Sequence, residues 1–83
     1  MYLVRLEKSV VKSIEKLNEP IYSQLKKAIL NLAKNPRPNG YLKLKGRDGY
    51  RIRVGDYRII YEIIDNLLIV NVIELGHRKD IYN

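Results

Sequence analysis

The sequence contains no cysteine and a single histidine among its 83 residues. The absence of cysteine excludes disulfide bonds and thiolate metal sites, and it fits a reducing cytosol. One histidine also argues against a structural zinc site, which needs several histidine or cysteine ligands. We therefore expect neither a metal nor a cofactor.

Long apolar stretches are missing as well. The longest run is Leu67–Val70, far short of the roughly 20 residues that a membrane-spanning helix requires. Met1-Tyr2-Leu3 is followed closely by charged residues, and the N-terminus therefore does not resemble a signal peptide. These absences predict a cytoplasmic protein that does not bind membranes.

Negative charge is scarce, because 9 acidic residues stand against 16 basic ones, which gives a net charge of +7. Apolar residues make up 46% of the chain, enough for one small domain, which we assign to residues 1–83. A small basic domain usually binds nucleic acid or an acidic protein.

The stretch Tyr50–Tyr61, YRIRVGDYRIIY, alternates as two strands around Gly55-Asp56. Glycine at the first central position suits a two-residue type II′ turn. This turn places Arg53 opposite Arg58, and strand alternation puts Arg51 on the same face as both. Like charges directly opposite each other weaken a sheet. The arrangement therefore favours a surface that binds a polyanion.

The rest of the pattern predicts a strand at 2–7, a helix at 9–18 with Ser9 as its N-cap, and a second helix that begins at Pro20 and ends at Asn35-Pro36. The short connection makes the two helices an antiparallel hairpin. The buried stripe of the second helix consists of Ile21, Leu25, Ala28, Ile29 and Leu32. With four more strands after the helices, the layout is an α+β two-layer sandwich with a mainly antiparallel sheet.

Two details concern the strands around the arginine hairpin. In the strand at 41–45, YLKLK, the leucines are predicted to face inward, and Lys43 and Lys45 outward. Asp65-Asn66 is predicted to be a two-residue turn into a strand at 67–75, which Gly76 ends. That turn places Ile59 opposite Val72 and Arg58 opposite Ile73, and it puts Glu74 on the apolar face opposite Tyr57.

Three segments in order resemble one known family: NPRPNGYLKLKG, YRIRVGDYRIIY and the terminal GHRKDIY. Together with the helix hairpin, they resemble the RelE/ParE-like toxins of toxin–antitoxin pairs over essentially the whole chain. The resemblance implies a microbial-ribonuclease-like sheet. The RelE branch cleaves messenger RNA in the ribosomal A site, whereas the ParE branch poisons DNA gyrase. The basic ending and the charged strand are more similar to the RelE branch.

The resemblance implies metal-free RNA cleavage, in which a 2′-hydroxyl attacks its own phosphate. Arginines would stabilise the phosphorane, and Tyr82 would stack on a nucleotide. His77 is a candidate acid or base, although the interpretation that it packs at the strand end or bonds a backbone carbonyl is slightly favoured. The candidate catalytic residues are Arg58, Arg78, Tyr82 and His77. The candidate RNA-binding residues are Arg51, Arg53, Lys43 and Lys45.

A toxin of this family also implies partners, namely the ribosome with its message and a neutralising antitoxin. We expect the antitoxin to be acidic and to dock an amphipathic helix on the toxin. Candidate docking points are apolar positions on the helix hairpin or beside Ile60, Ile69 and Ile73. Two other functions remain open, a gyrase inhibitor of the same fold and an RNA-binding module without catalysis.

Overall fold

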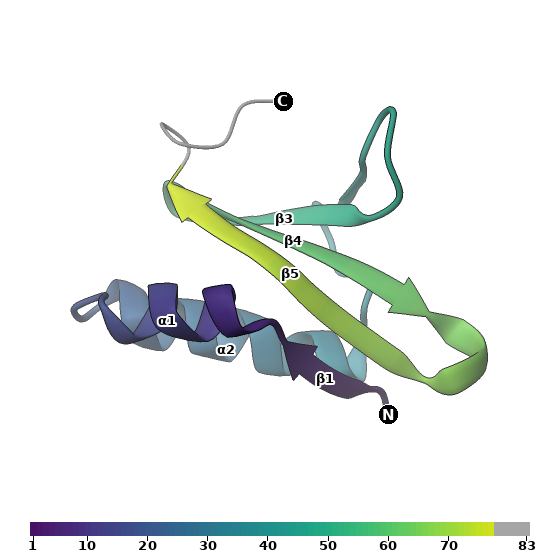
Figure 1. Cartoon of the computed structure of the whole chain (residues 1–83), viewed down its shortest axis with the longest axis horizontal. Coiled ribbons are helices and arrows are strands. Elements are labelled where there is room, and N and C mark those ends of the chain that lie inside the picture. Colours follow the sequence, from purple (N-terminus) through teal and green to yellow (C-terminus); the bar gives the residue numbers. More distant parts are fainter. Residues whose placement is uncertain (78–83) are drawn as a thin grey trace.

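A computed structural model describes residues 1–77, in which two helices lie on one face of a five-stranded sheet (Figure 1). The elements in chain order are β1 (Leu3–Leu6), α1 (Lys8–Glu15), α2 (Ile21–Lys34), β2 (Leu42–Lys43), β3 (Tyr50–Val54), β4 (Tyr57–Ile64), the 3-10 turn η1 (Asp65–Leu67) and β5 (Ile69–His77). The strand order is β1-β5-β4-β3-β2, and only the β1–β5 pairing is parallel within residues 1–77. The α+β sandwich predicted from the sequence is confirmed.

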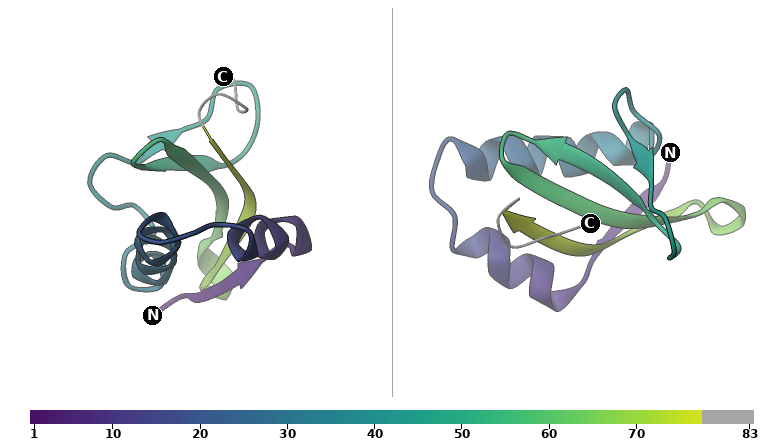
Figure 2. Two further views of the ribbon diagram at one scale, coloured as in Figure 1. Left: turned by 90° about the vertical axis from the view of Figure 1, so that its left-hand side faces the viewer. Right: turned by 90° about the horizontal axis from the view of Figure 1, so that it is seen from above.

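The helices form one layer beneath the sheet, as the two views of Figure 2 show. In α2 the predicted stripe faces the sheet, since Leu25, Ile29 and Leu32 are buried. The prediction for α1 was wrong in detail, because Glu7 precedes its first turn and Ser9 lies within the helix. No side chain caps this helix, and packing therefore contributes more to its stability than local capping does.

The core lies between the helices and the sheet, and Tyr61 is the largest of its fully buried side chains. Each such side chain contributes roughly 1.5–3 kcal/mol through burial. The cluster of buried residues consists of Val10, Leu25, Ile29, Leu32, Ile52, Ile59, Tyr61, Val70 and Val72. The opposite face of the sheet is not covered by either helix (Figure 2).

The β3–β4 hairpin has the predicted register, in which Arg53 pairs with Arg58 and Val54 with Tyr57. Gly55 has φ +60°, the left-handed value that the first central position of a type II′ turn requires. The turn therefore fixes the two arginines opposite each other.

The predicted register between β4 and β5 was wrong. Ile59 pairs with Leu75 rather than Val72, and Arg58 pairs with Gly76. The connection is longer than two residues, because η1 is followed by Leu68 in the left-handed conformation, with φ 56°. The strand continues through Gly76 to His77 instead of ending at this glycine.

A β-bulge between Ile60 and Tyr61 in the β4–β5 register adds a further shift. The pairing passes from Ile60–Glu74 to Tyr61–Val72, which leaves one extra residue on β5. One extra residue reverses which side chains face the core. Glu74 therefore lies on the face of the arginines, and the prediction that it shares the apolar face was wrong.

The faces of β2 are also the reverse of the prediction. Leu42 pairs with Arg51 and Lys43 with Tyr50, and paired residues share a face of the sheet. Leu42 is consequently 52% exposed beside the arginines. Alternation in the sequence identifies two faces, but an edge strand of two residues has too little core contact to select which one is buried.

Candidate active site

Three arginines gather on the sheet face that the helices leave open. Arg53 and Arg58 are paired, and Arg51 lies one row away, paired with Ile60 on β4. Gly76, which has no side chain, lies opposite Arg58 on the other side. The three side chains therefore form one continuous cationic surface, which we call the arginine face.

No carboxylate of residues 1–77 forms an ion pair with these three arginines, because the ion pairs there are Arg37–Asp65 and Arg47–Glu74. Burial lowers the pKa of Arg51, and the positive charges of Arg58 and Arg53 lower it further. The positive charges of the three arginines repel one another as long as no anion is bound. A bound anion would relieve this repulsion, and the arginine face is therefore suited to an RNA phosphate.

The Nε atom of Arg58 is buried and has no hydrogen-bond partner within the described part of the chain. An unsatisfied buried donor is costly, and such a group is a functional-site candidate. A guanidinium at this position is suited to stabilise a developing negative charge.

A groove of about 580 Å³ extends from the arginine face around the edge of β3. Arg51 and Arg53 line one side of it, and Asn31 of α2 and Asn39 of the following loop line the other. These amides are hydrogen-bond donors and acceptors. The groove therefore offers a path along which a polynucleotide backbone can leave the arginine face.

The remaining predicted site residues are placed differently. His77 pairs with Tyr57, and their rings meet edge-on with centroids 5.2 Å apart. Tyr57 packs against the core, so His77 lies on the opposite face from Arg58. Lys43 shares the face of Tyr50, and Lys45 is exposed in the loop after β2. Arg78 and Tyr82 lie outside the described residues.

Two charged residues of this region were missed by sequence reasoning. Glu74 lies on the arginine face, and Arg47 of the β2–β3 loop approaches it with Nη1 3.8 Å from Oε1. Both side chains are about half exposed, at 45% and 50%. The bulge that turns Glu74 outward leaves no mark in the alternation of the strand, and no sequence signal identifies it.

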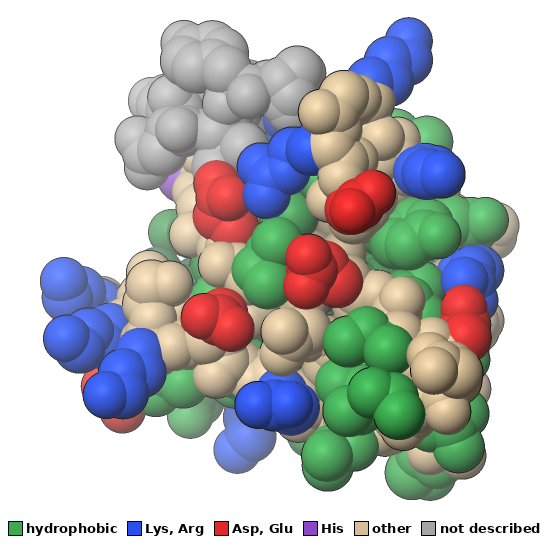
Figure 3. Space-filling view, turned by 45° about the vertical axis from the view of Figure 1, so that its right-hand side comes forward, with side chains coloured by type: hydrophobic (Ala, Val, Ile, Leu, Met, Phe, Trp, Pro, Cys, Tyr) green, Lys and Arg blue, Asp and Glu red, His purple; other side chains and the backbone are tan. Residues whose placement is uncertain are grey.

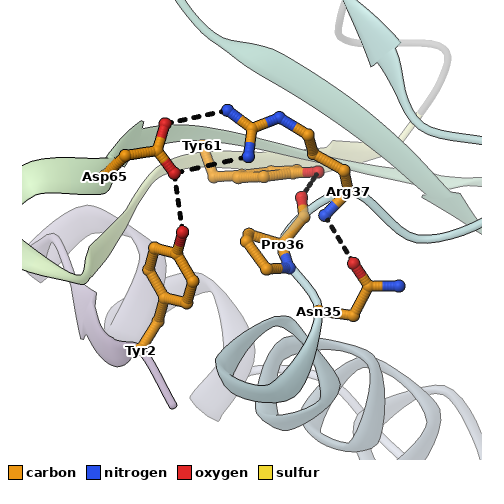
Figure 4. Close-up of polar contacts among 6 residues, drawn as sticks. All are labelled: Tyr2, Asn35, Pro36, Arg37, Tyr61 and Asp65. Carbon is orange, nitrogen blue, oxygen red and sulfur yellow. Dashed lines mark hydrogen bonds and ion pairs between the residues drawn. The ribbon is translucent and has the colours of Figure 1, made fainter.

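A polar cluster beside the sheet joins three distant segments, as Figure 4 shows. Arg37, in the loop after α2, donates to both carboxylate oxygens of Asp65, with Nη2 3.0 Å from Oδ2. The hydroxyl of Tyr2 donates to the same carboxylate at 2.6 Å. Both donors lower the pKa of Asp65, the Arg37 hydrogen bond most strongly.

The loop after α2 is held at two further points. The buried hydroxyl of Tyr61 donates to the carbonyl oxygen of Pro36 at 2.7 Å, and burial raises the pKa of this tyrosine to about 12. The guanidinium of Arg37 lies over the ring of Tyr50, 5.6 Å from its centroid, within the range of a cation–π contact. Tyr50 precedes Arg51 on β3, and the cluster therefore braces the strand that carries the arginines.

Within residues 1–77, no helix is long and apolar enough to span a membrane, and no group of histidine and acidic residues is placed to hold a metal ion.

Comparison with known proteins identifies the family. Residues 4–82 match the family model described as the ParE toxin of the type II toxin–antitoxin system parDE. The mRNA interferase toxin RelE of Escherichia coli K12 is 32% identical over 81 residues, which cover 94% of this chain and 84% of that protein.

Solved structures agree with this assignment. RelE in the archaeal RelE–RelB complex from Pyrococcus horikoshii OT3 superposes with a TM-score of 0.83 at 31% identity, covering 93% of this chain and 94% of that one. The intact Escherichia coli RelBE toxin–antitoxin complex gives a TM-score of 0.79 at 31% identity, with 93% and 96% of the two chains covered. The chain therefore belongs to the RelE/ParE-like toxin family of type II toxin–antitoxin systems.

Proposed function

We propose that this toxin is a ribosome-dependent endoribonuclease that cleaves messenger RNA in the A site and so inhibits translation in the cytoplasm. The observation that carries the proposal is the arginine face, where Arg51, Arg53 and Arg58 lie together and none of them forms an ion pair with a carboxylate of residues 1–77. Such a surface repels itself unless an anion binds. The relative named an mRNA interferase toxin supports the same reading.

The chemistry uses the 2′-hydroxyl of the RNA as the nucleophile and needs no metal or cofactor. Attack on the adjacent phosphate builds negative charge on the phosphorane oxygens. Arg58 stabilises that charge as a fixed, permanently protonated cation, and we assign the same role to Arg78. Arg51 and Arg53 hold the RNA backbone, and Tyr82 stacks on a nucleotide. The ribosome presents the message in the geometry for attack.

The direct test adds the purified protein to ribosomes stalled on a defined message and maps new 5′ ends by primer extension. We expect cuts within the A-site codon for the wild-type protein and their loss in Arg58→Ala and Arg78→Ala. Lys34→Ala is a matched control, because it removes an exposed cation at the end of α2, away from the arginine face. Cleavage by the two arginine variants at the wild-type rate would overturn the assignment of these residues.

Gyrase inhibition is the second candidate, because the matching family model is described as a ParE toxin. This function requires a protein-binding surface and no RNA chemistry. Plasmid topology in poisoned cells separates the two functions. Linear or relaxed plasmid with intact message indicates gyrase as the target, whereas supercoiled plasmid with cut message indicates the ribonuclease.

We also propose an antitoxin partner, because similar toxin structures were solved with their antitoxins. An apolar groove of about 280 Å³ between the helices suits an amphipathic helix. It is lined by Leu6, Val11, Ile14, Glu15, Tyr22, Lys26, Ile29 and Leu30. The net charge of +7 favours an acidic helix as its occupant.

The groove lies on the helix hairpin, one of the two places where the sequence led us to expect docking points. Ile60 is only 2% exposed and cannot serve as one. In contrast, Leu30 is 58% exposed at the groove. Leu30→Glu is expected to weaken antitoxin binding in calorimetry while leaving ribosomal cleavage intact. Unchanged affinity would show that the antitoxin docks elsewhere, for example on the exposed apolar side chains visible in Figure 3.

A further inference from the structure

The bulge on β5 brings a carboxylate to the arginine face. On that face one row consists of Arg53, Arg58 and Gly76, and the adjacent row consists of Arg51, Ile60 and Glu74. Glu74 is thus a diagonal neighbour of Arg58, a relationship in which side chains are about 7–8 Å apart at their bases. The carboxylate and the guanidinium can both reach one phosphodiester group placed between them.

The carboxylate of Glu74 is not engaged by a strong partner within residues 1–77. Its ion pair with Arg47 spans 3.8 Å between half-exposed side chains, and such surface pairs contribute little to stability. Ile60, between Glu74 and Arg51 in its row, is 2% exposed. This buried side chain makes the middle of the row apolar, whereas the carboxylate of Glu74 at the end of the row remains 45% exposed.

The other residues of the described site are poorly suited to accept a proton. Arginine effectively does not deprotonate in proteins. His77 lies on the face of Tyr57, and Lys43 lies on the face of Tyr50. An ionised carboxylate, in contrast, offers only acceptor positions.

We propose that Glu74 is the general base of the cleavage reaction. This inference rests on the endoribonuclease function proposed above and names the group that starts the chemistry. Glu74 takes the proton from the 2′-hydroxyl as the 2′-oxygen bonds to the adjacent phosphorus. The bond from phosphorus to the 5′-oxygen then breaks, and the leaving oxygen takes a proton from water. The products are a 2′,3′-cyclic phosphate and a 5′-hydroxyl, and Glu74 returns its proton to solvent.

Arg47 takes no part in the reaction in this scheme. Its long ion pair with Glu74 contributes little in the free protein, and the carboxylate exchanges this pair for the 2′-hydroxyl when RNA binds. Removing Arg47 should therefore leave the base in place, whereas removing the carboxylate should not. A comparison of variants at the two positions therefore distinguishes a chemical role of Glu74 from a role of the ion pair in anchoring the β2–β3 loop.

The experiment measures single-turnover cleavage on programmed ribosomes, with protein in excess and ribosome binding measured in parallel. Glu74→Gln is expected to lower the cleavage rate by about 100-fold or more, as loss of a general base does, with unchanged binding. Arg47→Ala and Glu62→Gln are expected to stay within about 3-fold of the wild-type rate by comparison with that base effect. Glu62 is the matched control, since it pairs with Asn71 further along the strands.

Chemical rescue provides a readout that a structural role would not change. Formate added to Glu74→Ala should restore part of the cleavage rate, because a small carboxylate can occupy the vacated position. Wild-type cleavage by Glu74→Gln, or an Arg47→Ala defect as large as that of Glu74→Gln, would overturn the proposal. A wild-type protein that does not cleave would overturn the proposed function as well, so the two failures are distinguishable.

Discussion

Arg53 and Arg58 lie directly opposite each other across the β3–β4 hairpin. Like charges in this position cost stability, and no carboxylate of residues 1–77 forms an ion pair with either arginine. The hairpin thus keeps a local repulsion that an anionic ligand would relieve. A stability measurement on the free protein can detect this repulsion without any substrate.

Arg53→Thr is expected to raise the free energy of unfolding by roughly 0.2–1 kcal/mol, because it removes the repulsion and places a good strand former at the position. Urea denaturation measures the change. Arg5→Thr is the matched control, since Arg5 lies on β1 opposite the neutral Asn71. An equal gain in both variants would show that strand propensity alone accounts for the effect.

Tyr61→Phe is expected to destabilise the fold by about 1–3 kcal/mol, because it leaves the buried carbonyl oxygen of Pro36 without its hydrogen bond. Thermal and urea unfolding measure the loss. Tyr22→Phe is a suitable control on α2, where the side chain is only partly buried. A loss no larger for Tyr61 than for Tyr22 would contradict the expectation.

The Arg37–Asp65 contact should make stability depend on pH in the acidic range. Its hydrogen bonds hold the pKa of Asp65 below the usual value, so the folded state binds the proton more weakly than the unfolded state does. The stabilisation is present above the unfolded pKa and disappears as pH falls through the folded pKa. Wild type should therefore exceed Asp65→Asn in stability at neutral pH and lose this advantage below about pH 4.

Arg37→Gln should flatten the same acidic limb of the stability curve, because it removes the principal cause of the lowered pKa. The measurement is urea denaturation at several pH values between neutral and strongly acidic. A difference between wild type and Asp65→Asn that does not change with pH would contradict the linkage.

Gly49→Ala is expected to cost more stability than Gly46→Ala. Gly49 has φ +122°, and a Cβ there would lie 3.2 Å from the backbone oxygen of Tyr61. Gly46 also has positive φ, but a Cβ there meets nothing within 4 Å. Strain of this kind costs of order 1–3 kcal/mol. The melting temperatures of the two variants test which substitution costs more stability. Equal losses would show that the backbone conformation alone, and not the close contact with Tyr61, determines the cost.

The sequence was sufficient to predict the arginine hairpin, because Gly55-Asp56 specifies both the turn and the register that follows from it. It was insufficient for β5. Leu68 adopts φ 56° without being a glycine, and the bulge near Ile60 has no compositional signature. Both features are selected by packing over the whole sheet, which a local pattern does not contain.

The residues of the candidate site also separate into those that local sequence could predict and those that it could not. Arg51, Arg53 and Arg58 could be found because alternation over one hairpin determines their shared face. Glu74 was assigned to the wrong face because its position depends on the bulge, and Arg47 was overlooked because loop residues have no periodicity. Sequence reasoning therefore placed these three cations on one face and missed the carboxylate that lies beside them.

The parallel pairing of β1 with β5 has a consequence for the synthesis of this toxin. Leu3 pairs with Ile69, and Leu6 with Val72, so the first strand made is completed by the last. Contacts between such distant segments form slowly, after a large loss of chain entropy. The sheet that carries the arginines therefore lacks its β1–β5 pairing until β5 has been synthesised, and a partly made chain presents the arginine face only on an incomplete sheet.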